Sequence, residues 1–369
     1  MTRAQRSLVH RVAVPRRAVT RAVRVRTARV SRRTERATRL VLALIILSLA
    51  RAQQPSKTAF VDYRYFPGLA RMDGNWAALK AASDGKVYVG LACHGCDGHL
   101  LSEPGVYVPV WVFVPERLTE PWRTILYFND EGAQSDGMEY EGGESSGLAH
   151  GVLDQLVRSG NLVIAADVRG SGATRTTRDS ALSSGEFGHL FDTNTSAAYA
   201  SWSLGCSLLG MRVEDVVRCV EYTMQHHGVD TRRLHLIGKG GAALWCLFAA
   251  ALDHRIRSLI CTDGLITYRT LAMADRYLYG ADVFVPEILR YFDLPEVAAV
   301  IAPRPLVLIE PKDGMKRTVD INLARRTYQP THDAYRVAGA ENSFRIECGD
   351  PGLQDAEHYL SVIETMENG

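Results

Sequence analysis

The chain has 369 residues, 46% of them apolar and 23% charged, which is the composition of a globular protein and enough for one large α/β domain. Its net charge of +2 conceals an asymmetry, because residues 1–52 contain 14 arginines and one acid, whereas 53–369 contain 29 basic and 40 acidic residues. The acidic body argues against nucleic acid as a partner.

The first 52 residues predict export. Residues 40–50 form an apolar run flanked by arginines, and Ala50-Arg51-Ala52 places small residues where a signal peptidase cleaves. This run of eleven residues suits the core of a signal peptide but falls short of the roughly 20 that span a bilayer. We therefore expect an Arg-rich leader and signal peptide at 1–52, a single domain at 53–369, a periplasmic or extracellular location and no stable membrane span.

Strand-like and helix-like patterns alternate along the body, as expected for parallel strands joined by crossover helices. The pattern predicts eight strands, within 86–93, 105–115, 123–130, 161–172, 234–238, 256–264, 304–314 and 343–350. It predicts helices at 146–160, 210–230, 242–252, 282–302, 319–328 and 355–366. The polar stretch 174–203 is expected to be a long surface loop.

The cysteines predict neither a metal nor a cofactor. Seven cysteines leave at least one unpaired in an exported chain. Cys93-His94-Gly95-Cys96 has the form of one metal-binding pair, but structural zinc needs a second pair at a fixed spacing, which the sequence lacks. A local disulfide or free thiols are therefore expected at this motif.

Five segments resemble the α/β-hydrolase superfamily, and more narrowly bacterial acetyl xylan esterase-like proteins. They are VPVWVFVP, ADVRGSG, SLLGMRVEDVVRCVEYTMQHHGVD, AAALD and DLPEVAAVIAPRPLVLIEPKDG. The resemblance implies the α/β-hydrolase fold, with a mostly parallel eight-stranded sheet and helices on both faces. It also implies esterase ancestry, with a carbohydrate ester as the substrate class.

By this resemblance, the position of the catalytic nucleophile corresponds to Gly240. In the superfamily a serine stands in a G-x-S-x-G turn between a strand and a helix. The matching stretch LHLIGKGGAALWCLFAAALD (234–253) has Gly238-Lys239-Gly240-Gly241-Ala242 at that turn. Glycine has no side-chain atom that could attack an ester, so the chain resembles a serine-less copy of the domain.

Asp313 and His358 are the candidates for the acid and the base. In this fold the acid and the histidine follow late strands, and these two residues come after the last two predicted strands. Asp313 would orient the imidazole and stabilise its charged form. Asp313 could instead be a turn residue in KDGMK, and His358 a surface histidine at the start of the closing helix.

An oxyanion hole would use the backbone N–H groups of Gly241 and of the turn 129–132, for which Glu131 is the candidate. That turn is Asn129-Asp130-Glu131-Gly132. Its two carboxylates would oppose the negative charge that develops during ester hydrolysis. The turn is therefore a second departure from a working esterase.

Ser207 is the alternative nucleophile. Gly205-Cys206-Ser207-Leu208-Leu209 is a partial elbow without the final glycine, at the start of a predicted helix. A serine there is also a favoured helix cap, and Cys206 at the same helix start could be a thiolate.

Three hypotheses follow. The first is an exported esterase-like pseudoenzyme that binds an acylated carbohydrate or a partner in the cleft that would have held the ancestral active site. The second is an active ester hydrolase with a relocated nucleophile, or with water activated by Asp313 and His358. The third is half of a bipartite enzyme in which a serine-bearing homologous subunit supplies the chemistry.

Overall fold

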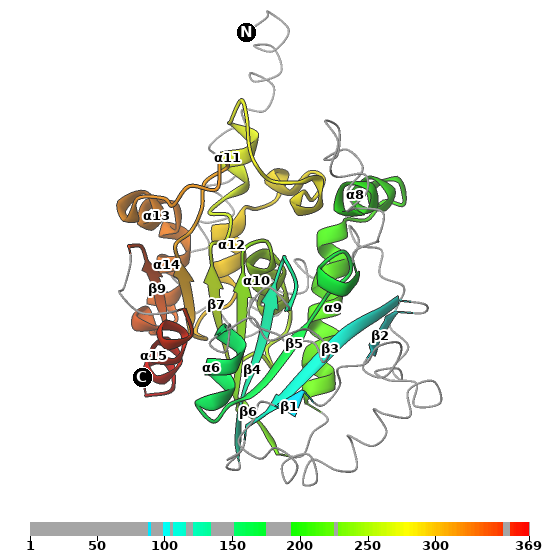
Figure 1. The fold of residues 1–369 in the computed structure, drawn as a ribbon. Helices are drawn as coiled ribbons and strands as arrows, with labels where there is room; N and C mark the ends of the chain where they lie inside the picture. Colours follow the sequence, from blue (N-terminus) through cyan, green and yellow to red (C-terminus); the bar gives the residue numbers. More distant parts are fainter. Residues whose placement is uncertain are drawn as a thin grey trace, which may run out of the picture.

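The computed structural model describes residues 88–89, 99–103, 106–115, 121–133, 151–174, 193–224, 228–349 and 355–368. The predicted leader 1–52 and the motif Cys93–Cys96 lie outside these residues. Within them nine strands form one sheet in the order β1-β3-β5-β4-β6-β7-β8-β9, with β2 paired to β3 (Figure 1). The strands are β1 (Tyr88–Val89), β2 (His99–Glu103), β3 (Val106–Val114), β4 (Trp122–Asn129), β5 (Leu162–Ala166), β6 (Val229–Lys239), β7 (Ser258–Thr262), β8 (Leu306–Ile309) and β9 (Phe344–Glu347).

The predicted fold class is confirmed, and the predicted strand number is wrong by one. All neighbouring strands from β5 through β9 are parallel, whereas β3 runs antiparallel to β1, β2 and β5. The strand that the sequence pattern missed is β2, whose five residues HLLSE lack a sustained apolar alternation. It pairs antiparallel with β3 across a short connection.

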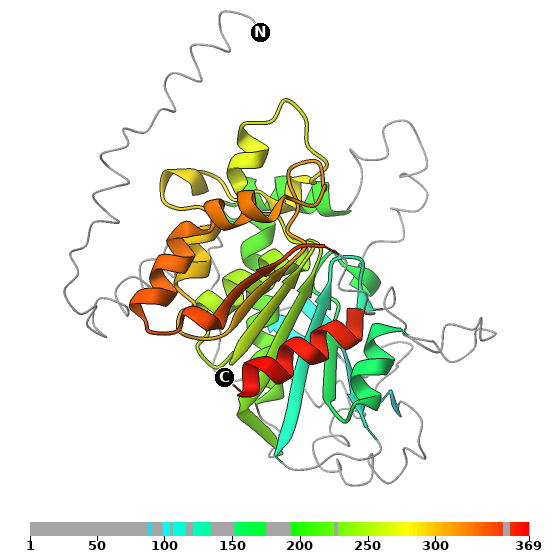
Figure 2. The same cartoon turned by 90° about the vertical axis from the view of Figure 1, so that its left-hand side faces the viewer.

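Helices cover both faces of the sheet, as the fold class requires. Figure 2 shows α15 lying across one face with α6 on the same side. The helices are α6 (Val152–Arg158), α8 (Thr193–Ser203), α9 (Leu208–Thr223), α10 (Ala242–Leu252), α11 (Tyr268–Ala272), α12 (Leu294–Ala299), α13 (Ile321–Thr327), α14 (Gln329–Val337) and α15 (Asp355–Asn368). The described connections also contain the short 3₁₀ helices η2 (Gly172–Thr174), η4 (Ala281–Val283), η5 (Ile288–Arg290) and η6 (Glu341–Ser343).

The two faces bury two separate sets of apolar side chains, because successive residues of a strand point to opposite faces. In β4, Leu126 and Phe128 belong to the core beneath α9 and α10. Ile125 and Tyr127 belong to the core beneath α6 and α15. Both sets are almost completely buried, so the central strands are apolar on both sides, as is typical of parallel sheets.

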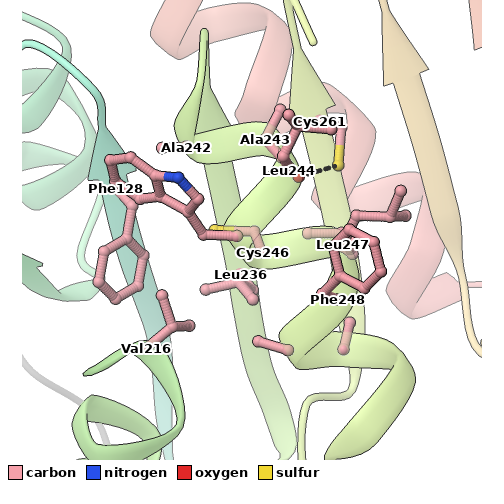
Figure 3. Packing of buried hydrophobic residues seen from close by; sticks show 14 of the residues in the cluster. Phe128, Val216, Leu236, Ala242, Ala243, Leu244, Cys246, Leu247, Phe248 and Cys261 are labelled. Atoms are coloured by element: carbon pink, nitrogen blue, oxygen red, sulfur yellow. Dashed lines mark hydrogen bonds between the residues drawn. The ribbon is translucent and has the colours of Figure 1, made fainter. Parts of the chain in front are cut away.

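The helix that follows the glycine turn is fixed firmly against the sheet. Residues 242–251 of α10 are all buried, and its alanines allow close approach to β6 and β7 (Figure 3). The Cys261 thiol donates to the Ala243 carbonyl at 3.5 Å. A Cβ at Gly238 would lie 2.8 Å from the Ala242 carbonyl oxygen, so only glycine fits that crossing. The turn between β6 and α10 is therefore a rigid feature.

Several predicted helix and loop boundaries were wrong. Residues 193–203 form α8, although the polar stretch 174–203 was expected to be a loop throughout. The region 282–302 contains α12 and the short turns η4 and η5 rather than one long helix. The segment that follows α13 forms α14, which was not predicted. For α8 tertiary packing decides the structure, because its own apolar periodicity is weak.

None of the described helices combines the length and the hydropathy that a membrane-spanning segment needs.

Candidate functional site

The turn after β6 places Gly240 at its apex, at the carboxyl end of the sheet. Gly240 has a φ of +64°, a conformation that residues with a Cβ rarely adopt. Its N–H donates to the Thr262 carbonyl of β7 at 2.9 Å, and Gly241 caps α10. The strand–turn–helix geometry of a nucleophile elbow is present, with glycine at its apex.

The carboxyl group of Asp130 lies directly over this apex. A Cβ added to Gly240 would be 2.9 Å from Asp130 Cγ and 3.1 Å from Oδ2, and closer still to Oδ1. Asp130 Oδ2 accepts the Gly241 N–H at 2.9 Å. The Asp130 carboxyl therefore fills the space where a side chain of the turn would stand, and it takes the N–H that an oxyanion hole would use.

Burial raises the pKa of Asp130 above its usual range, although the hydrogen bond from Gly241 and the charge of Lys316 act in the opposite direction. The charge of Glu131 adds to the increase. The Glu131 N–H, the second expected oxyanion donor, binds the side-chain oxygen of Asn129 at 3.0 Å. Both expected donors thus have acceptors within the protein.

Strand register explains why Asp130 and Gly240 meet. The pair Asn129–Lys239 is the last in the ladder between β4 and β6, so the next residue of each strand lies at the same level. The turn 129–132 was singled out from the sequence for its two carboxylates, but the contact with Gly240 was not. A predicted register between these two strands could have found it.

Two further acidic residues, both with strained backbone conformations, follow the next strands at this edge of the sheet. Asp263 follows β7 and Glu310 follows β8, with φ of +56° and +50°. Such angles are uncommon outside glycine and cost on the order of 1 kcal/mol each. The charges of both carboxylates are paired with Lys312, whose Nζ lies 2.8 Å from Asp263 Oδ1 and 3.5 Å from Glu310 Oε2. The carboxyl edge of the sheet therefore carries a row of carboxylates, which we call the acidic edge (Asp130, Asp263 and Glu310).

Asp313 follows β8 as predicted but is bound within its own turn. Its carboxyl accepts the backbone N–H groups of Met315 at 2.8 Å and Arg317 at 3.0 Å, and it pairs with the Arg317 guanidinium. Burial favours the neutral acid, but the hydrogen bonds from Arg317 and Met315 outweigh it and lower the pKa of Asp313. This is the arrangement expected of the turn residue.

His358 lies within α15, and its partner is Glu347. His358 Nε2 is 2.7 Å from Glu347 Oε2, at the end of β9. In the part of the chain that the structure describes, no hydrogen bond joins His358 to Asp313. The structure thus places the expected acid and base near the same edge of the sheet but gives each a different partner.

The alternative nucleophile Ser207 is a helix cap. Its side-chain oxygen accepts the Gly210 N–H at 3.1 Å at the start of α9, and the residue is only 1% exposed. The Cys206 thiol is also buried and donates to the Ser201 carbonyl at 3.3 Å. Neither side chain is available to a substrate in this structure, which corrects the suggestion that Ser207 is a nucleophile.

A metal centre does not arise from the described residues, where no group of three or more histidine, cysteine or acidic side chains is arranged to hold an ion. Two carboxylates of the acidic edge, Asp263 and Glu310, pair with Lys312.

Comparison with known proteins agrees with the fold. Residues 101–348 match the sequence model described as the Abhydrolase family. The chain is also 24% identical over 239 residues to YtaP of Bacillus subtilis (strain 168), which is named as a hydrolase, and the alignment spans 62% of this chain and 75% of YtaP.

Solved structures share the fold at low sequence identity. A Bacteroides fragilis NCTC 9343 protein titled as an acetyl xylan esterase is 17% identical, with a TM-score of 0.54 over 87% of this chain and 88% of that one. A promiscuous CE15 esterase from a marine bacterial metagenome is 12% identical, with a TM-score of 0.54 over 90% of this chain and 91% of that one. At these identities the likeness shows the α/β-hydrolase fold.

Proposed function

The chain belongs to the Abhydrolase family, and on that premise we propose that it is an esterase-like α/β-hydrolase-fold protein that has lost serine catalysis and acts by binding. The resemblance to acetyl xylan esterases of the same fold supports an acylated carbohydrate as the ligand class. The Arg-rich leader with its short apolar run supports an exported protein.

The observation that supports the loss of catalysis is the Asp130 carboxyl over Gly240. Acyl transfer needs a nucleophilic atom at the apex and N–H groups that are ready to receive the developing oxyanion. Gly240 offers no such atom, and the Gly241 N–H already binds Asp130. Loss of a nucleophile alone lowers the rate by about four to six orders of magnitude. A carboxylate in the oxyanion position acts in the same direction.

A binding role also fits the way this edge is built. Asp263 and Glu310 are held in left-handed conformations that a purely structural turn would leave to glycine. Lys316 acts on Asp130, the third residue of the acidic edge, and its Nζ lies 5.5 Å from the centre of the Tyr279 ring. Hydroxyl groups of a sugar can bind such carboxylates, and a sugar face can pack on such a ring. The proposed ligand therefore needs no chemical step at Gly240.

The test is binding and turnover of one ligand. Full-length protein is titrated calorimetrically with acetylated xylo-oligosaccharides, and free acetate is then assayed in the same samples. We expect binding without acetate release above the buffer rate. The variant Lys316→Gln, which removes the charge that acts on Asp130, should weaken binding severalfold, whereas Arg336→Gln, on the exposed face of α14, should leave it unchanged. Acetate release at an enzymatic rate, or no binding at all, would contradict the proposal.

A further inference from the structure

A hollow of about 720 Å³ lies at the amino-terminal edge of the sheet, at the end of the strands opposite to Gly240. It lies where β6 and β7 begin and where Pro305 leads into β8. The volume is within the range of small-molecule sites. This position separates it from the acidic edge, so the proposed function does not account for it.

The floor of the hollow is a chain of hydrogen bonds in which two side chains are buried and the third, Glu367, is partly exposed. His235 Nδ1 is 2.8 Å from Ser258 Oγ, and His235 Nε2 is 3.2 Å from Glu367 Oε1. His235 and Ser258 are 1% and 2% exposed. Because an ionised Glu367 can only accept, the neutral imidazole must donate from Nε2 and accept the Ser258 hydroxyl at Nδ1. These two hydrogen bonds therefore hold the three side chains in one arrangement.

This floor has the composition of a catalytic triad, but its burial argues against nucleophilic catalysis. The Ser258 hydroxyl faces the imidazole, and the residue has almost no exposed surface. Burial lowers the pKa of His235, so the imidazole is neutral at neutral pH. The positive charge in the hollow must then come from its arginines.

Five arginines line the hollow, against two acids, Asp230 and Glu367. The arginines are Arg232, Arg233, Arg255, Arg257 and Arg304. Three of them have acidic partners: Arg232 pairs with Asp230, Arg233 with Glu367, and Arg255 with Asp253. Arg304 donates to the main-chain carbonyls of Ala250, Asp253 and Ile256.

Arg257 and Arg232 are the groups that a ligand could reach. Among the described residues the exposed Arg257 guanidinium has no acidic partner. Arg232 is also largely exposed, and its Nε and Nη2 bind Asp230. Its Nη1 is directed to no acceptor among the described residues. His254 lies exposed on the same rim.

We propose that this hollow binds a small molecule with two or more oxyanion groups, either phosphates or carboxylates. Guanidinium forks match the geometry of both groups and bind them through paired, charge-assisted hydrogen bonds. Arg257 is the principal contact and Arg232 the second, above the fixed floor of His235 and Ser258. The site is independent of the elbow, so it stands whether or not the protein hydrolyses esters.

The test is calorimetric titration of the full-length protein with inorganic pyrophosphate and, separately, with citrate at low salt. We expect one of them to bind, and the one that binds identifies the phosphate or the carboxylate class. Arg257→Gln should weaken binding roughly tenfold, the usual effect of losing a charge-assisted contact. The control Arg326→Gln removes an exposed arginine of α13 and should have no effect.

A second variant, Asp230→Asn, is expected to strengthen anion binding rather than weaken it. Asp230→Asn removes the carboxylate that competes for Arg232, so binding should tighten severalfold. Failure of both anions to bind would overturn the proposal. It would also be overturned by equal weakening in Arg257→Gln and Arg326→Gln, because the binding would then be a non-specific charge effect.

Discussion

Gly240 and Asp130 exclude a side chain between them. The left-handed φ of Gly240 by itself disfavours any residue with a Cβ, and the Asp130 carboxyl occupies the space above it. A serine at this position would have to displace that carboxyl and so break its hydrogen bond to the Gly241 N–H. Restoring the expected nucleophile therefore needs more than one substitution.

We expect Gly240→Ser to destabilise the protein by about 2–3 kcal/mol and to confer no esterase activity. Gly339→Ser is the matched control, because Gly339 has a similar φ of +69° but no atom within 4 Å of an added Cβ. It should cost only about 1 kcal/mol, the backbone contribution. Urea unfolding measures both.

The difference between these two variants reports the contact with Asp130. In an Asp130→Ala background the additional cost of Gly240→Ser should disappear, since the obstructing carboxyl is gone. Equal destabilisation by Gly240→Ser and Gly339→Ser would show that Asp130 does not occupy the apex.

At the scale of elements, α15 is held to the sheet by Glu367 near its end. Glu367 binds His235 of β6, and it pairs with Arg233 and Arg123. The hydrogen bond with His235 is the largest cause that lowers the pKa of Glu367 to about 2, and Arg233 and Arg123 add to it. A lowered pKa means that ionised Glu367 stabilises the folded state.

We expect Glu367→Gln to lower the free energy of unfolding by about 1 kcal/mol at neutral pH, a small value because the group is partly exposed. The stabilisation is present above pH 4.5, the unfolded value, and is lost as the pH falls through about 2. The wild type and the variant should therefore converge in strong acid. Urea unfolding across this pH range measures it.

Glu364→Gln is the control on the same helix, because Glu364 is exposed. It should leave the stability unchanged within a few tenths of a kcal/mol. A difference between wild type and Glu367→Gln that stays constant down to pH 2 would contradict the assigned ion pairs.

The elements that could be predicted from the sequence are those with strong local signals. The helix α10 was predicted with its observed bounds, because a glycine turn precedes it and an apolar run fills it. The segment of α8 is polar, and only its place against the rest of the fold makes it helical. β2 was missed because its five residues lack a clear alternation.

The site was predictable in part for the same reason. Gly240 follows from a contiguous motif, and the structure gives it the left-handed turn that the motif needs. The Asp130 contact joins two turns 110 residues apart through the register of β4 and β6. The separate partners of Asp313 and His358 depend on how the loops at the sheet edge fold, which no local pattern records.

At the scale of the whole molecule, the two ends of the sheet differ in charge. The carboxyl end has the acidic edge, with the elbow filled by Asp130. The amino end has the hollow lined by five arginines. Parallel strands bring residues of like position to the same end, so each end gathers side chains from several distant segments. The two proposals can therefore be tested separately.

The central claim is that no residue of this chain forms an acyl intermediate. The most direct measurement is rapid-quench mass spectrometry of the full-length protein with 4-nitrophenyl acetate. We expect no burst of 4-nitrophenol and no acetyl ester or thioester on the protein. An acetyl group on a serine or cysteine, formed as fast as the burst and then hydrolysed, would contradict it.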